Sequence, residues 1–127
     1  MGLGSFVMRC NLVSNDVDGL KKWLKKDAHR DYAKLISIRA NGKVYPRWDS
    51  CKIVSYWRPD FLSFLIEFAK FVQGTIHLVL EDESEYAIII FNKGKCVIEL
   101  WNVFYKIEAK DFLKYRKEGD RINVDAK

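Results

Sequence analysis

The stretch PDFLSFLIEFAKFVQG, residues 59–74, is the best starting point for interpreting this chain of 127 residues. Four polar side chains recur within it at spacings of three or four residues: Asp60, Ser63, Glu67 and Lys70. This spacing aligns them in one narrow stripe of a helix, and eight large apolar side chains cover the remaining surface. Pro59 suits a first helical turn, and Gly74 suits a left-handed C-terminal cap. The stretch therefore predicts a buried central helix, about residues 60–73.

The length of this helix excludes a membrane span. About 13 helical residues reach only ~20 Å, whereas the hydrocarbon core of a bilayer is ~30 Å thick. Burying eight such side chains corresponds to roughly 12–24 kcal/mol of gross transfer free energy. Packing inside a protein core therefore accounts for the segment.

The residues that follow predict a three-stranded antiparallel meander packed on the helix. Its strands are expected at Thr75–Leu80, Tyr86–Phe91 and Cys96–Trp101, with a charged tip at 81–85 and a turn at Asn92-Lys93-Gly94. Because residues 87–91 include no polar side chain, we expect both faces of the middle strand to be covered or nearly so. Val103–Ile107 extends the last strand or adds another, Lys110–Glu118 is a short C-terminal helix, and the last eight residues are frayed.

The residues that precede the central helix alternate between strand and helix patterns. Residues 6–13 have the period of a first strand, and Ser14 or Asn15 caps a basic N-terminal helix that ends near Lys34. Residues 35–39 and 43–45 form a hairpin around Asn41-Gly42, which Pro46 ends or places on an edge. A further strand is expected at Cys51–Trp57. The sum is one α+β domain over residues 1–127 with a mostly antiparallel sheet.

Charge and cysteine content favour a soluble cytoplasmic protein. The net charge is +5, and residues 1–58 carry 12 Lys and Arg against 5 acidic residues, whereas residues 59–105 carry 3 against 7. This polarity suits a nucleic acid or an acidic protein partner equally. Cys10, Cys51 and Cys96 are far apart, lack zinc-ligand spacing and are expected to be free thiols. No signal peptide is recognised, because the apolar run before Arg9 is short and lacks a basic lead.

Motifs for catalysis are nearly absent, so we expect a protein that is not an enzyme and has no cofactor. The sequence contains no P-loop, no GxGxxG, no GxSxG and no HExxH. His77 lies in an apolar strand pattern without an evident Asp or Ser companion in the sequence, which favours a structural histidine over a general base. The acidic tip could hold a divalent cation through its oxygens, but a solvated hairpin tip explains it without a ligand. Its residues are Glu81, Asp82, Glu83 and Glu85.

Three groups of residues are candidates for binding. The first interleaves cations with aromatic rings: Lys43, Tyr45, Arg47, Trp48, Lys52, Tyr56, Trp57 and Arg58. Protein interfaces and single-stranded nucleic acids both use this combination, and a hairpin whose rings pack in the core would also explain it. The second group is the basic face Lys21, Lys22, Lys25 and Lys26, and the acidic tip is the third.

Our first hypothesis is a non-catalytic, inhibitor-like or adaptor-like protein that acts by binding another protein. The aromatic and basic segment would provide its anchors, with Trp48 or Trp57 exposed. The alternative is a protein that binds single-stranded RNA or DNA with the helix lysines and the same aromatic segment.

Overall fold

The computed structural model describes residues 5–26, 30–48, 59–80, 86–100 and 105–117. In chain order they form β1 (Ser5–Ser14), α1 (Val17–Leu24), α2 (Arg30–Ala33), β2 (Ile36–Ile38), β3 (Lys43–Pro46), α3 (Pro59–Phe68), β4 (Val72–Leu80), β5 (Tyr86–Asn92), β6 (Lys95–Leu100), β7 (Tyr105–Glu108) and α4 (Ala109–Lys117). The predicted strand at Cys51–Trp57, the acidic tip and the frayed C-terminus lie outside these ranges.

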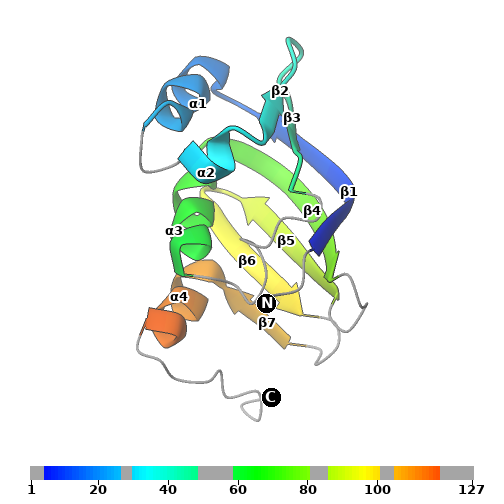
Figure 1. Ribbon diagram of the computed structural model, residues 1–127, viewed down its shortest axis with the longest axis vertical. Helices are drawn as coiled ribbons and strands as arrows, with labels where there is room; N and C mark the ends of the chain where they lie inside the picture. Colours follow the sequence, from blue (N-terminus) through cyan, green and yellow to red (C-terminus); the bar gives the residue numbers. More distant parts are fainter. Residues whose placement is uncertain (1–4, 27–29, 49–58, 81–85, 101–104, 118–127) are drawn as a thin grey trace.

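The described strands form one seven-stranded sheet in the order β2-β3-β1-β4-β5-β6-β7. Every neighbouring pair is antiparallel. The helices gather along one side of this twisted sheet, with α3 between α2 and α4 (Figure 1). The prediction of one small α+β domain with a mostly antiparallel sheet is confirmed. The sequence left open whether Val103–Ile107 extends the last strand or adds another. Its described residues, 105–107, lie in a separate strand, β7.

Two of the hairpin turns form where the sequence predicts them. In the turn between β2 and β3, the Gly42 amide donates to the Arg39 carbonyl at 2.9 Å, and Gly42 has a φ of +90°. In the turn between β5 and β6, Lys93 and Gly94 both have positive φ, at 53° and 78°. Two consecutive residues with positive φ give the twist of a two-residue hairpin loop.

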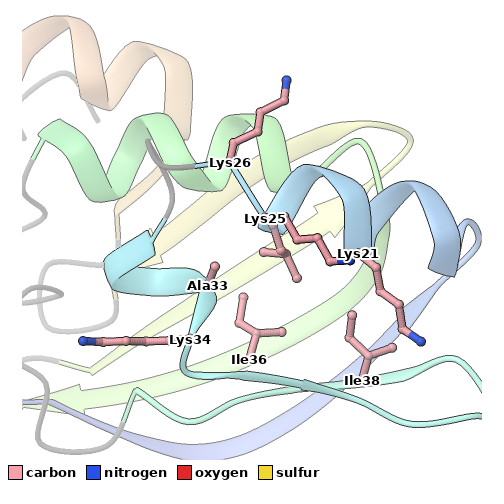
Figure 2. Close-up of a pocket in the computed structure, with 8 residues that line it drawn as sticks. Lys21, Lys25, Lys26, Ala33, Lys34, Ile36 and Ile38 are labelled. Atoms are coloured by element: carbon pink, nitrogen blue, oxygen red, sulfur yellow. The ribbon is translucent and has the colours of Figure 1, made fainter.

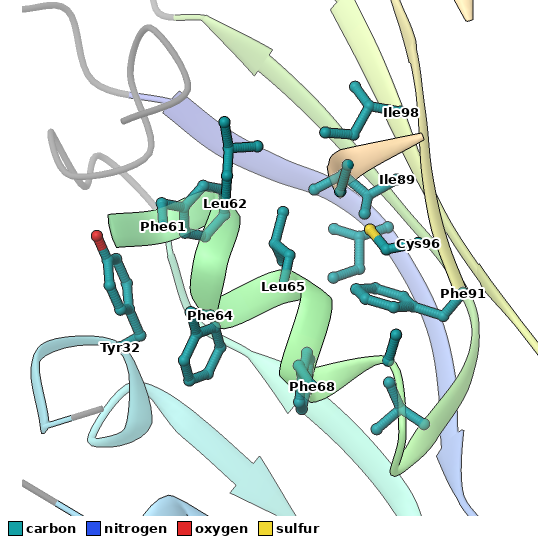
Figure 3. Close-up of a cluster of buried hydrophobic side chains, with 14 of the residues drawn as sticks. Tyr32, Phe61, Leu62, Phe64, Leu65, Phe68, Ile89, Phe91, Cys96 and Ile98 are labelled. Atoms are coloured by element: carbon teal, nitrogen blue, oxygen red, sulfur yellow. The ribbon is translucent and has the colours of Figure 1, made fainter. Parts of the chain in front are cut away.

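The central helix lies at the middle of the core and contributes several of its largest side chains. Five of its side chains are buried: Phe61, Leu62, Phe64, Leu65 and Phe68. Asp60 and Glu67 are exposed, as the polar stripe predicts. Figure 3 shows α3 between the Tyr32 ring on one side and the sheet residues Ile89, Phe91 and Ile98 on the other.

The predicted C-terminal end of this helix is wrong. Helix α3 ends at Phe68, and a tight turn follows in which the Phe71 amide donates to the Phe68 carbonyl at 2.9 Å. Val72 already belongs to β4, where it pairs with Ser14 of β1. Phe71 and Val72 continue the apolar period of the helix, but the Phe71 amide closes the turn and Val72 pairs with β1 instead.

Gly74 therefore is not a helix cap. It lies in β4 with a φ of +130°, and a Cβ atom at this position would stand 1.8 Å from the Asn11 carbonyl oxygen of β1. Only glycine allows this conformation and this approach of the two backbones.

The N-terminal helix also differs from its prediction. Asp16, rather than Ser14 or Asn15, is the N-cap, and its carboxylate accepts a hydrogen bond from the Gly19 amide at 3.0 Å. The helix does not continue to Lys34, because α1 ends at Leu24 and a separate short helix, α2, covers Arg30–Ala33.

The meander is less enclosed than predicted. Its middle strand alternates between buried and half-buried side chains, so Ala87, Ile89 and Phe91 face the helices. Ile88 and Ile90 lie on the opposite face, away from the described helices, and are only half-buried. Of the helices that the structure describes, none has the length and apolar character to cross a membrane.

Candidate functional site

A groove of about 480 Å³ lies between α1, the end of α2 and β2 (Figure 2). We call it the lysine groove. Its lining consists of Lys21, Leu24, Lys25, Lys26, Ala33, Lys34, Ile36 and Ile38. The groove therefore has an apolar floor and a rim of four lysines. In Figure 2 the ammonium groups of Lys26 and Lys34 point away from the floor, whereas Lys21 and Lys25 lie beside it.

Helical and strand periodicity explain why these side chains meet. Leu20 and Trp23 are buried on the side of α1 that packs in the core, which leaves Lys21 and Lys25, four residues apart, on a neighbouring face. Ile36 and Ile38 are two residues apart and so share one face of β2. In Figure 2 they point toward α1, from which Lys21 and Lys25 extend.

The charges at the rim are uncompensated within the part of the chain that the structure describes. All four lysine side chains are exposed, and the ion pairs found there join other residues, Lys70 to Glu67 and Lys110 to Glu108. Like charges four residues apart on a helix cost a few tenths of a kcal/mol. An anionic ligand in the groove would remove this repulsion.

The two groups of sequence-predicted binding residues lie on opposite faces of the sheet. Lys21, Lys25 and Lys26 line the groove, whereas Lys22 is exposed but does not. Lys43, Tyr45 and Arg47 alternate with buried residues along and just after β3, on the face away from the helices. The described members of the two groups therefore do not form one surface.

Of the two indoles of which at least one is expected to be exposed, Trp48 is buried, and Trp57 lies outside the described residues. The relative exposure of Trp48 is 0%, and its indole packs edge-on against Phe61 at a centroid distance of 5.1 Å. Val44, Pro46 and Trp48 are all buried, so the alternation of β3 carries Trp48 into the core. This period-2 signal was present in the sequence.

The remaining rings and charges of the candidate set are only partly described. Tyr45 is half-buried, and the Arg39 guanidinium lies 5.0 Å from the centre of its ring. Lys52, Tyr56, Trp57 and Arg58 lie outside the described residues, as do Glu81, Asp82, Glu83 and Glu85.

The apolar half of the groove was not predicted as part of a site. Leu24 was expected on the buried face of the N-terminal helix, and Ile36 and Ile38 were expected only as strand residues. Lys34 was treated as a helix end. The sequence feature that could have indicated this apolar half is the short distance in sequence between the basic helix and an Ile-Ser-Ile strand.

The described thiols do not have the properties of nucleophiles. Burial raises the pKa of Cys10 to about 11, and a hydrogen bond with the backbone of Leu12 lowers it by a smaller amount. Burial also raises the pKa of Cys96 far above its ordinary value, and Glu108 acts in the same direction. Both thiols therefore stay protonated at neutral pH, whereas the thiolate is the reactive form.

His77 has a partner that its sequence position did not reveal. Its Nδ1 lies 2.6 Å from the Tyr86 hydroxyl on the neighbouring strand. Burial lowers the pKa of His77, and the positive charge of Arg9 lowers it further. The pair lies on the face of the sheet that is turned away from the described helices.

Cys96 gives a prediction for stability at alkaline pH. Its thiol ionises near pH 9 in the unfolded chain but stays protonated in the fold, so above pH 9 the native state binds more protons. The free energy of unfolding should therefore fall as pH rises, by about 1.4 kcal/mol per pH unit for this group. Urea melts of wild type and Cys96→Ala between pH 8 and 10.5 measure the difference in slope. Parallel pH profiles of the two proteins would contradict the prediction.

Comparisons with protein-family models, curated proteins and solved structures give no match. Among the described side chains, no group of three or more His, Cys, Asp or Glu is arranged to hold a metal ion. Within the described residues, the lysine groove is the site that we develop as the candidate.

Proposed function

We propose that this protein is a small non-catalytic binding protein that holds an acidic, partly apolar segment of another protein in the lysine groove. The observation that supports this proposal is the combination of four exposed lysines, which form no ion pair with another described residue, and a floor of Leu24, Ala33, Ile36 and Ile38. Carboxylates would pair with the rim, and aliphatic side chains would cover the floor. An inhibitor or an adaptor would both act in this way.

The floor of the groove favours a protein over a nucleic acid. Grooves for single-stranded nucleic acid combine cations with aromatic rings on which bases stack. The groove lining has aliphatic side chains where such rings would be needed. Of the described rings in the candidate set, Trp48 is buried and Tyr45 lies on the other face of the sheet.

A synthetic peptide tests the proposal. The probe is an acetylated and amidated nonapeptide, Glu-Glu-Thr-Val-Thr-Val-Thr-Glu-Glu, titrated into the protein at 50 mM salt and followed by amide shifts in NMR spectra. We expect saturable binding that weakens as salt rises, because exposed charges are screened over about 10 Å at 0.1 M. Lys21→Gln with Lys25→Gln should weaken binding roughly fivefold to tenfold, since each exposed pair contributes up to about 1 kcal/mol.

The matched control removes the same charge elsewhere. Lys22 and Lys114 are both exposed and lie outside the groove lining, so Lys22→Gln with Lys114→Gln should change the affinity less than twofold. Equal losses in the two double variants would show that only net charge matters. Absence of binding to the peptide, together with salt-dependent binding of a mixed single-stranded oligonucleotide, would replace this proposal with the nucleic-acid one.

A further inference from the structure

Among the described strands, the lysine groove borders an edge of the sheet that has no further neighbour. β2 is the first strand in the sheet order, and within the described residues β3 is its one neighbour. Its sequence, Ile-Ser-Ile, contains none of the charged or proline residues with which edge strands usually prevent pairing.

The hydrogen-bond phase of the hairpin shows which backbone groups face this edge. The Arg39 amide donates to the Lys43 carbonyl at 2.8 Å, and the Arg47 amide donates to the Leu35 carbonyl at 2.6 Å. Hydrogen-bonded pairs alternate with non-hydrogen-bonded pairs along an antiparallel ladder. Ser37 therefore bonds inward to Tyr45, and the N–H and C=O groups of Ile36 and Ile38 point to the open edge.

Two further observations agree with this phase. The residue opposite Ile36 is Pro46, which has no N–H to donate. The side chains of Ile36 and Ile38 both line the lysine groove. At Ile36 and Ile38, β2 thus presents backbone N–H and C=O groups to the open edge and apolar side chains to the lysine groove.

We propose that the acidic partner segment binds as an additional β-strand along the free edge of β2, with alternate side chains entering the lysine groove. This inference rests on the proposed function and specifies the conformation of its ligand. Addition of a strand to a sheet edge gives affinity through main-chain hydrogen bonds, and pockets for alternate side chains give specificity. The charge of the rim requires carboxylates on the groove-facing side of that strand, flanking the apolar residues opposite Ile36 and Ile38.

The nonapeptide is designed for this geometry. Its two valines are two residues apart, as are Ile36 and Ile38, and glutamates lie on the same side at both ends. In an antiparallel added strand, the valine amides point to β2, and the threonine amides point away from it.

N-methylation of the peptide tests the valine amides and the threonine amides separately, and the protein itself is left unchanged. We expect methylation of both valine amides to weaken binding at least tenfold, and methylation of the first two threonine amides to weaken it less than threefold. Exchange of the Ile36 and Ile38 amide hydrogens with solvent should also slow when the unmodified peptide is bound. Loss of binding on threonine methylation alone would indicate a parallel strand and would still support pairing with the edge.

Similar effects of the two methylated peptides, or unchanged exchange at Ile36 and Ile38, would overturn the inference. If the unmodified peptide still needs Lys21 and Lys25 in that case, the groove binds acidic segments in another conformation, and the proposed function stands. If the unmodified peptide does not bind at 50 mM salt, the proposed function fails, and this inference fails with it.

Discussion

Phe68→Ala should lower the free energy of unfolding by about 3–5 kcal/mol, the usual loss when a buried aromatic side chain is removed. The Phe68 ring is completely buried. Its centroid lies 5.3 Å from that of Phe64, 5.4 Å from that of Phe91 and 6.0 Å from that of Trp23. The ring thus contacts side chains of α1, α3 and β5. Its removal leaves a cavity between these three elements, and they cannot all move to fill it.

Ser63→Ala is the matched control, because Ser63 lies on the polar stripe of the same helix and is only half-buried. We expect it to change stability by less than about 0.5 kcal/mol, as for most surface substitutions. Urea melts of the two variants compare these values. Equal losses would mean that the helix presents a different face to the core.

Gly74→Ala should cost more than about 3 kcal/mol, because two penalties combine. A residue with a side chain at a φ of +130° is strained by about 1–3 kcal/mol. In addition, its Cβ atom would overlap the Asn11 carbonyl oxygen, from which it would be separated by 1.8 Å. β1 and β4 would have to move apart at the centre of the sheet.

Gly94→Ala separates the two penalties. Gly94 also has a positive φ, of 78°, but no atom lies within 4 Å of the position its Cβ would take. It should cost only about 1–2 kcal/mol, the conformational penalty alone. Thermal or urea unfolding of both variants measures the difference. A loss at Gly74 no larger than at Gly94 would show that the two backbones do not approach as closely as described.

Local patterns predicted those elements of the fold that depend on neighbours in sequence. The turns at Gly42 and Gly94 and the positions of β5 and β6 follow from residues only a few positions apart, whereas the alternation of buried side chains along β5 was not predicted. The end of α3 does not follow from such local patterns. Phe71 continues the helical period, and the competing partner, β1, lies some sixty residues earlier in the sequence. The same pairing gives Gly74 a different role from the predicted cap.

The candidate site was predictable only in part, for a similar reason. The lysines at 21–26 were recognised, but periodicity along one helix does not show which strand faces it. The fold brings Ile36 and Ile38 beneath Lys21 and Lys25, and this placement depends on how the chain reverses after α1. The buried position of Trp48 follows from the alternation of β3, which continues past the strand and places Trp48 with Val44 in the core.

The position of β1 has a consequence for the synthesis of the protein. β1 is made first, yet it lies inside the sheet, with β3 on one edge and β4 on the other. Pairing with β3 joins Leu12 to Val44, whereas pairing with β4 joins Ser5 to Leu80. Contacts between residues so far apart require closure of a long loop and slow the folding of sheets. The growing chain therefore exposes one edge of β1 until β4 has been made, and an unpaired strand edge of this kind is prone to misassembly and aggregation.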